Sequence, residues 1–101
     1  MKPYLICYDI QENYLRTKIG NKIIEYGLDR INKSVYLSAI SESSLTTLEN
    51  WLQQQMQAKG MPDDSLITLP LAAHEVQSLR VYGRNDLDKA ELTGTKSTLI
   101  I

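Results

Sequence analysis

The sequence is poor in the residues from which disulfides and most metal and cofactor sites are built. Its 101 residues include a single cysteine, Cys7, so no internal disulfide can form, and we expect the reducing environment of the cytoplasm. The only histidine, His74, has no cysteine or histidine partner with which to hold a metal. The five glycines are dispersed and form no phosphate-binding loop, which leaves ATP and dinucleotide binding without support.

Long apolar runs are also absent. No stretch approaches the length needed to cross a bilayer, so we expect no membrane segment. The first residues carry one lysine before a short apolar stretch that ends in an acid, and this pattern predicts no secretory signal. The length predicts one small domain, which pairing with a second copy would help to stabilise.

The charges are few and unevenly distributed. A net charge of -1 argues against a general binder of polyanions. Residues 1–40 nevertheless hold six basic side chains against four acids, whereas residues 41–77 hold five acids against Lys59 alone. If the protein binds nucleic acid, the amino-terminal half should provide the surface.

Hydrophobic periodicity predicts a strand and then a helix in the first third of the chain. Residues 4–8 are apolar at every position, which is typical of a central strand buried on both faces. From Leu15 to Tyr26 the apolar positions follow helical spacing, and Gly27 stands where a left-handed helix cap favours glycine. Residues 28–31 and 34–40 are rich in β-branched and aromatic side chains, which favours two strands or one long bent strand.

A second helix is predicted in the middle of the chain. Residues 41–44 offer serine caps, and the leucines that follow form an apolar stripe as far as Met56, before Gly60. Residues 66–69 and 79–82 read as two short strands.

This order of elements, β-α-β-β-α-β with an extra strand, predicts a ferredoxin-like α+β sandwich. Two helices would cover one face of a four-stranded antiparallel sheet, and a second subunit would cover the other face in a sheet-to-sheet homodimer. We expect residues 1–83 to form this domain. Residues 84–101 should provide a linker and an additional C-terminal strand that completes the dimer or contacts a partner.

One acid and several basic residues form the candidate site. Asp9 follows the first strand directly, where a carboxylate is suited to hold a metal ion, although the same residue type commonly ends a strand and caps a turn. Arginine can hold a phosphate with two donors and lysine acts as a point charge. The candidate phosphate contacts are Arg16, Lys18, Arg30 and Lys33, with Ser34 as a further donor. The alternative for all of them is an ordinary solvated surface.

Five motifs follow one another along the chain in a fixed order and spacing: Tyr8-Asp9-Ile10, Arg16-Thr17-Lys18, Tyr26-Gly27-Leu28, Arg30-Ile31-Asn32-Lys33-Ser34-Val35-Tyr36 and Pro70-Leu71. Together they extend over most of the chain, and they resemble those of the CRISPR-associated protein two family. Many relatives carry further acids just after the aspartate of the first motif, whereas here Gln11-Glu12-Asn13 follow.

The resemblance implies a ferredoxin-like homodimer in which Asp9 faces its symmetry mate. Two such carboxylates and substrate phosphate oxygens would suffice for Mg²⁺, which is poorly held by one carboxylate alone. The implied function is that of a CRISPR adaptation adaptor, which bridges the integrase and holds a DNA duplex, or RNA, during spacer acquisition. A Mg²⁺-dependent endonuclease acting through the Asp9 pair is the alternative. A ribonuclease toxin related in fold to the VapD family, or a small-ligand sensor, is a third hypothesis.

Overall fold

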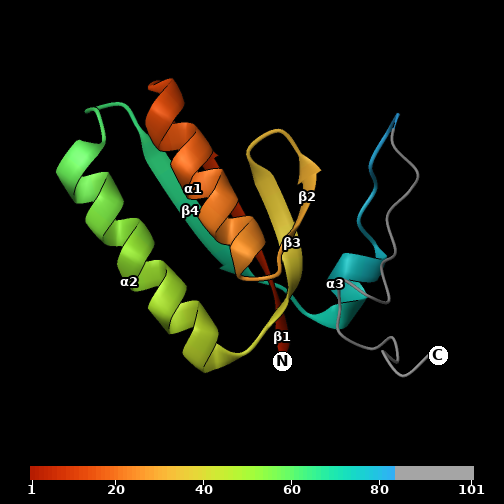
Figure 1. Ribbon diagram of the computed structural model, residues 1–101. Coiled ribbons are helices and arrows are strands. Elements are labelled where there is room, and N and C mark those ends of the chain that lie inside the picture. The colour runs from red at the N-terminus through yellow and green to blue at the C-terminus, as the bar shows by residue number, and fades with distance from the viewer. Residues whose placement is uncertain (84–101) are drawn as a thin grey trace.

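The computed structural model describes residues 1–83, which form a four-stranded antiparallel sheet with two long helices on one face (Figure 1). The strand order is β2-β3-β1-β4, as in a ferredoxin-like sandwich, so the predicted fold is confirmed. The predicted C-terminal strand lies outside the described residues. The elements are β1 (Lys2–Asp9), α1 (Asn13–Glu25), β2 (Asp29–Asn32), β3 (Val35–Ile40), α2 (Glu42–Lys59), β4 (Ser65–Pro70) and α3 (Ala73–Gln77).

The ends of α1 are fixed by local chemistry. The Glu12 carboxylate accepts hydrogen bonds from the backbone N–H groups of Tyr14 and Leu15, at 2.7 and 2.8 Å, which satisfies two donors that the first helical turn leaves without partners. Gly27 has a φ of 95°, the left-handed conformation expected of a helix cap. Between these ends one face of the helix is fully buried against the sheet, through Leu15, Ile19 and Ile23.

The start of α2 is equally local. The Ser41 hydroxyl accepts a hydrogen bond from the Ser44 backbone N–H at 3.3 Å, which confirms the predicted serine cap. The predicted leucine stripe packs into the same core as α1, through Leu45, Leu48 and Leu52. Within residues 1–83, no helix combines the length and apolar character needed to cross a bilayer.

Strand β1 occupies the centre of the sheet and separates two apolar layers. Ile6 lies opposite Tyr36 of β3 and faces the helices, whereas the neighbouring Leu5 lies opposite Leu37 and faces the other side. Because successive side chains of a strand point to opposite faces, an apolar residue at every position of β1 can contribute to a core. The prediction of a central strand is therefore confirmed.

The predicted strand at residues 79–82 is wrong. Residues 79–82 have no regular structure, and they follow the short helix α3, which the sequence did not indicate. The Glu75 carboxylate accepts a hydrogen bond from the Ala72 backbone N–H at 2.7 Å, which fixes the start of this helix. Val76 and Leu79, three residues apart, both pack against the far face of the sheet. These contacts, and not a strand, hold this segment against the sheet.

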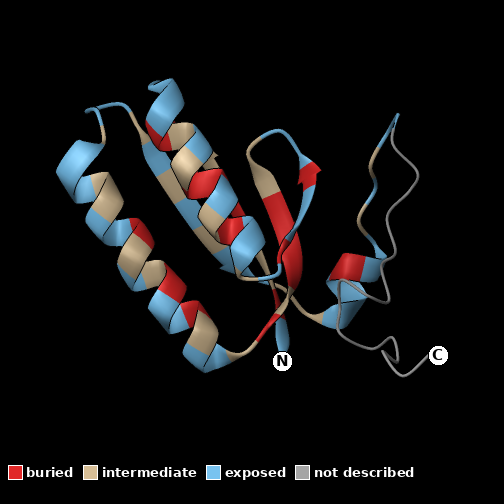
Figure 2. Cartoon of the chain, viewed as in Figure 1, coloured by how far each residue is buried: buried red, intermediate tan, exposed pale blue. Residues whose placement is uncertain are grey.

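Helix α3 covers only part of that far face (Figure 2). On β4, the side chains of Ile67 and Leu69 are 56% and 47% exposed, and they lie opposite Cys7 and Leu5 of β1. These residues define an uncovered apolar face. The predicted sheet-to-sheet homodimer would bury it, and it stays a prediction.

A close approach of α1 to the sheet yields the first testable expectation. A Cβ atom on Gly20 would lie 2.7 Å from the Tyr36 hydroxyl and 2.8 Å from the Tyr8 hydroxyl. Overpacking of this kind costs about 1–3 kcal/mol, which exceeds the 0.5–1 kcal/mol that alanine gains over glycine within a helix. We expect Gly20→Ala to lower the free energy of unfolding by about 1–2 kcal/mol in urea denaturation.

The matched control removes the obstructing hydroxyl groups. In a Tyr8→Phe, Tyr36→Phe background the same Gly20→Ala change should cost much less, because the space is then open. If Gly20→Ala stabilises the otherwise unaltered chain, the helix does not approach the tyrosines this closely.

Candidate nucleic-acid interface

An open pocket of about 480 Å³ lies between α1 and the hairpin formed by β2 and β3. No acidic side chain is among the described residues that line it. Its lining includes four of the five residues that the sequence indicated as phosphate contacts, namely Arg16, Arg30, Lys33 and Ser34. The tertiary structure therefore gathers residues from separate elements into one basic surface, which we call the hairpin pocket.

The hairpin turn brings two of these residues to the pocket. Lys33 and Ser34 form the turn between β2 and β3, and Ser34 has a φ of 60°, which is uncommon for a residue other than glycine. The Ser34 carbonyl accepts a hydrogen bond from the Tyr8 backbone N–H at 3.1 Å, so the turn is bound to the end of β1. Arg30 lies opposite Tyr36 in the strand register, which directs it to the helical side of the sheet.

Arg16 has a structural role in addition to its place in the pocket. Its Nη1 atom donates to the carbonyl oxygens of Ile10 at 2.8 Å and Gln11 at 3.3 Å, and its Nη2 atom donates to the Asn13 side chain. These bonds hold the loop between β1 and α1. A guanidinium has five N–H donors, which exceeds the acceptors engaged here, so Arg16 can hold this loop and still face a phosphate.

Two tyrosines form the floor of the pocket. The Tyr8 and Tyr36 rings are stacked with centroids 5.9 Å apart, and their hydroxyl oxygens are 3.1 Å apart. Burial, together with the hydrogen bond to Tyr8, raises the pKa of Tyr36 to about 12, although the charge of Arg30 acts in the opposite direction. Tyr36 therefore remains neutral at physiological pH and does not reduce the positive charge of the pocket.

Apart from Arg16, sequence reasoning missed the residues that α1 contributes to the pocket wall. Thr17, Gly20, Asn21 and Ile24 all line it. Their spacing of three, four and seven residues from Thr17 places them on one face of the helix. This helical spacing was the sequence signal that could have identified the four residues, because it places them together on the helix face next to the apolar stripe.

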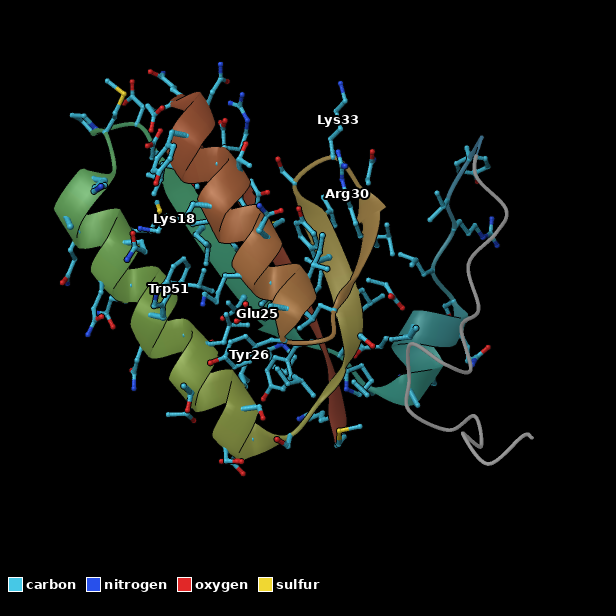
Figure 3. All side chains as sticks on the ribbon, in the orientation of Figure 1. Lys18, Glu25, Tyr26, Arg30, Lys33 and Trp51 are labelled. Carbon is cyan, nitrogen blue, oxygen red and sulfur yellow. The ribbon has the colours of Figure 1, made fainter. Side chains whose placement is uncertain are left out.

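Lys18 is not among the residues lining the hairpin pocket. Its Nζ atom lies 5.9 Å from the centre of the Trp51 ring, and Lys22 lies 5.1 Å from the same ring. Figure 3 shows Lys18 and Trp51 on the α2 side of α1, away from Arg30 and Lys33 on the hairpin. Lys18 is thus separated from the other candidate phosphate contacts.

Asp9 lies at the same end of the sheet as the pocket but on its opposite face. It is exposed, ends β1 and lies opposite Ser65 of β4. Since Tyr8 faces the helices, the alternation of the strand directs Asp9 to the far side, which also bears the uncovered Ile67. The carboxylate that caps the following helix belongs to Glu12.

A single chain offers Asp9 little help in holding a cation. Within residues 1–83, no group of three or more histidine, cysteine, aspartate or glutamate side chains could hold a metal ion. One carboxylate is the right donor type for Mg²⁺, but protein sites for this ion use one or two carboxylates together with water and substrate phosphates. A metal site at Asp9 therefore requires ligands from a second molecule.

The Tyr36 phenol predicts a dependence of stability on alkaline pH. Its folded pKa of about 12 lies above the ordinary value of 10.0. Its contribution to the free energy of unfolding is therefore fully present below pH 10 and is lost as the pH rises through about 12. Unfolding measurements from pH 9 upward should show a steeper loss for the unmodified chain than for Tyr36→Phe. In an absorbance titration of the phenolates, Tyr36→Phe should lack the tyrosine that titrates near 12 in the unmodified chain. If the variant instead lacks a tyrosine with the ordinary pKa of 10.0, the burial argument is contradicted.

Comparison with known proteins places this arrangement in a family. The family model described as CRISPR associated protein Cas2 matches residues 1–79. A Synechocystis sp. protein named CRISPR-associated endoribonuclease Cas2 3 is 30% identical over 86 residues, which cover 85% of this chain and 89% of that protein. A Francisella tularensis subsp. novicida protein named CRISPR-associated endoribonuclease Cas2 1 is 40% identical over 48 residues, covering 48% of this chain and 50% of that protein.

A solved structure agrees with the sequence comparisons. The structure of Streptococcus pyogenes Cas2 superposes with a TM-score of 0.67 at 17% identity, and the match covers 80% of this chain and 99% of that one. At this identity the likeness concerns the fold alone. The family model matches most of the chain, and the first relative is similar over nearly its whole length. This chain therefore belongs to the CRISPR-associated protein Cas2 family.

Proposed function

We propose that this protein acts in CRISPR adaptation as a dimeric nucleic-acid-binding adaptor that bridges the integrase during spacer acquisition. The observation that supports it most directly is the convergence of Arg16, Arg30 and Lys33 on the hairpin pocket, without an acidic side chain among the described lining residues. Phosphate neutralisation by such side chains supplies affinity that does not depend on base sequence. The proposed ligand is a DNA duplex, or RNA, and the proposed setting is the cytoplasm.

The uncovered apolar face supports the dimer in this proposal. Burying Ile67 and Leu69 against a second copy would stabilise the pair by about 25 cal/mol for each Å² of apolar area removed from water. A two-fold axis through this face would leave the hairpin pocket of each subunit on the outside, on the helical side of the sheet.

The salt dependence of binding tests the adaptor. We expect affinity for a short DNA duplex to fall steeply with salt, with a log–log slope of about -0.9 for each phosphate contacted. The Arg30→Ala, Lys33→Ala double variant should weaken binding and reduce that slope by about two, because two phosphate contacts are lost. Fluorescence anisotropy at several salt concentrations measures both quantities.

Two lysines outside the pocket provide matched controls. Lys18→Ala and Lys59→Ala remove the same charge from positions beside Trp51 and Tyr14. Both should leave the slope near that of the unmodified chain. If the controls and the double variant lose the same affinity for each charge removed, net charge, and not the hairpin pocket, determines binding.

A second candidate function is endonuclease activity at Asp9. The names of both relatives describe endoribonucleases, and Asp9 lies on the face that a second copy would cover. In such a dimer two Asp9 carboxylates, with substrate phosphate oxygens, would hold Mg²⁺. The ion would supply polarisation of the phosphate and activation of water. The protein would contribute the two acids and would position the phosphate between them.

Cleavage by matched variants separates the two functions. Short RNA and duplex DNA should be incubated with the unmodified chain and with Asp9→Asn, in Mg²⁺ or in chelator. If the nuclease proposal holds, cleavage requires both Mg²⁺ and Asp9, and it falls by more than about 100-fold in the variant. Absent cleavage, or equal cleavage by both proteins, contradicts it. Duplex affinity should survive Asp9→Asn in either case, because the hairpin pocket lies on the other face.

A further inference from the structure

A second hollow of about 490 Å³ adjoins the hairpin pocket. Its volume falls in the range of about 300–1,000 Å³ that is usual for small-molecule sites, as does that of the hairpin pocket. Its lining residues are Arg30, Ile31, Asn32, Lys33, Val81 and Tyr82. Arg30 and Lys33 line both hollows, so the two meet at the outer strand of the described sheet, β2.

Tyr82 distinguishes the second hollow from the first. Its side chain is 86% exposed, whereas Tyr36 in the hairpin pocket is 4% exposed. The segment after α3 runs upward beside β2 (Figure 1), and this course brings Tyr82 to the same hollow as the two basic side chains. An exposed aromatic ring beside cations, with no acid among the described lining residues, combines a surface for stacking with a surface for phosphate.

We propose that Tyr82 stacks on an unpaired base of a nucleic-acid strand whose phosphates contact Arg30 and Lys33. The inference rests on the proposed nucleic-acid binding and adds a substrate class to it. Bases inside a duplex are paired and already stacked on their neighbours, so the proposed ligand is an unpaired base in an overhang or a single-stranded stretch. The hairpin pocket would hold the backbone on one side of β2, and Tyr82 would hold the unpaired base on the other.

The test compares single-stranded and duplex ligands on the full chain. Fluorescence anisotropy should be measured with a short oligothymidylate, with a fully abasic strand of the same length, and with a blunt duplex. Tyr82→Ala should weaken oligothymidylate binding by about 5-fold to 100-fold, which is the usual effect of losing one base–aromatic stack. It should change binding of the fully abasic strand and of the blunt duplex by less than about twofold, since the first has no bases and the second has no unpaired base.

Two further variants control for general effects. Tyr82→Phe keeps the ring and should retain oligothymidylate affinity. Tyr14→Ala removes another exposed tyrosine, 66% exposed on α1 and close to Lys59, and should have no effect. Both comparisons separate stacking at Tyr82 from loss of exposed aromatic surface in general.

The outcomes distinguish this inference from the function on which it rests. If duplex binding is salt-dependent and sensitive to Arg30 and Lys33, but Tyr82→Ala leaves oligothymidylate binding unchanged, the stacking role is wrong and the adaptor remains. If Tyr82→Ala weakens all three ligands equally, Tyr82 does not read an unpaired base. If none of the ligands binds, the proposed function itself fails.

Discussion

Pairing of β1 with both β3 and β4 is the constraint on which the rest of the structure depends. The strand is bonded on each side over most of its length, from Lys2 to Cys7 with β3 and from Tyr4 to Asp9 with β4. Its register fixes which side chains face the helices, and a shift by one residue would exchange the two faces. Tyr8 and Asp9 are adjacent in the sequence, but this pairing places them on opposite sides of the sheet.

The hairpin pocket is built on that strand through contacts of hydroxyl and amide groups. The Tyr8 hydroxyl oxygen lies 3.1 Å from that of Tyr36. The Tyr8 backbone N–H donates a hydrogen bond to the Ser34 carbonyl in the turn. Gly20 allows α1 to come close above the two rings. The basic residues of the turn and of α1 are consequently held around a neutral floor, where their charges remain available to an anionic ligand.

Separation of the two candidate sites has a functional meaning. Charged residues that could neutralise phosphates lie on the helical side, whereas the acid that could hold a metal lies beside the uncovered apolar face. Under the proposed function, a nucleic acid would therefore be bound without any chemistry, and cleavage would need a second copy to complete its site. This separation explains why one fold is compatible both with an adaptor and with the endoribonucleases named among its relatives.

Local chemistry in the sequence determined much of the fold. Apolar spacing indicated both long helices, Gly27 and Ser41 marked a helix end and a helix start, and apolar residues at every position identified the central strand. Each of these signals depends on residues a few positions apart, which is why a sequence can reveal them. The basic residues of the amino-terminal half were also visible, although not their arrangement.

Only the tertiary structure decided which of those residues meet. The hairpin and α1 approach each other through long-range pairing, and this brings Arg30 and Lys33 to Arg16 and separates Lys18 from them. The same packing places Val76 of α3 and Leu79 after it against the far face of the sheet, which the residue types of this segment did not indicate. Residue types set what each side chain can do, and the packing of distant segments set which of them act together.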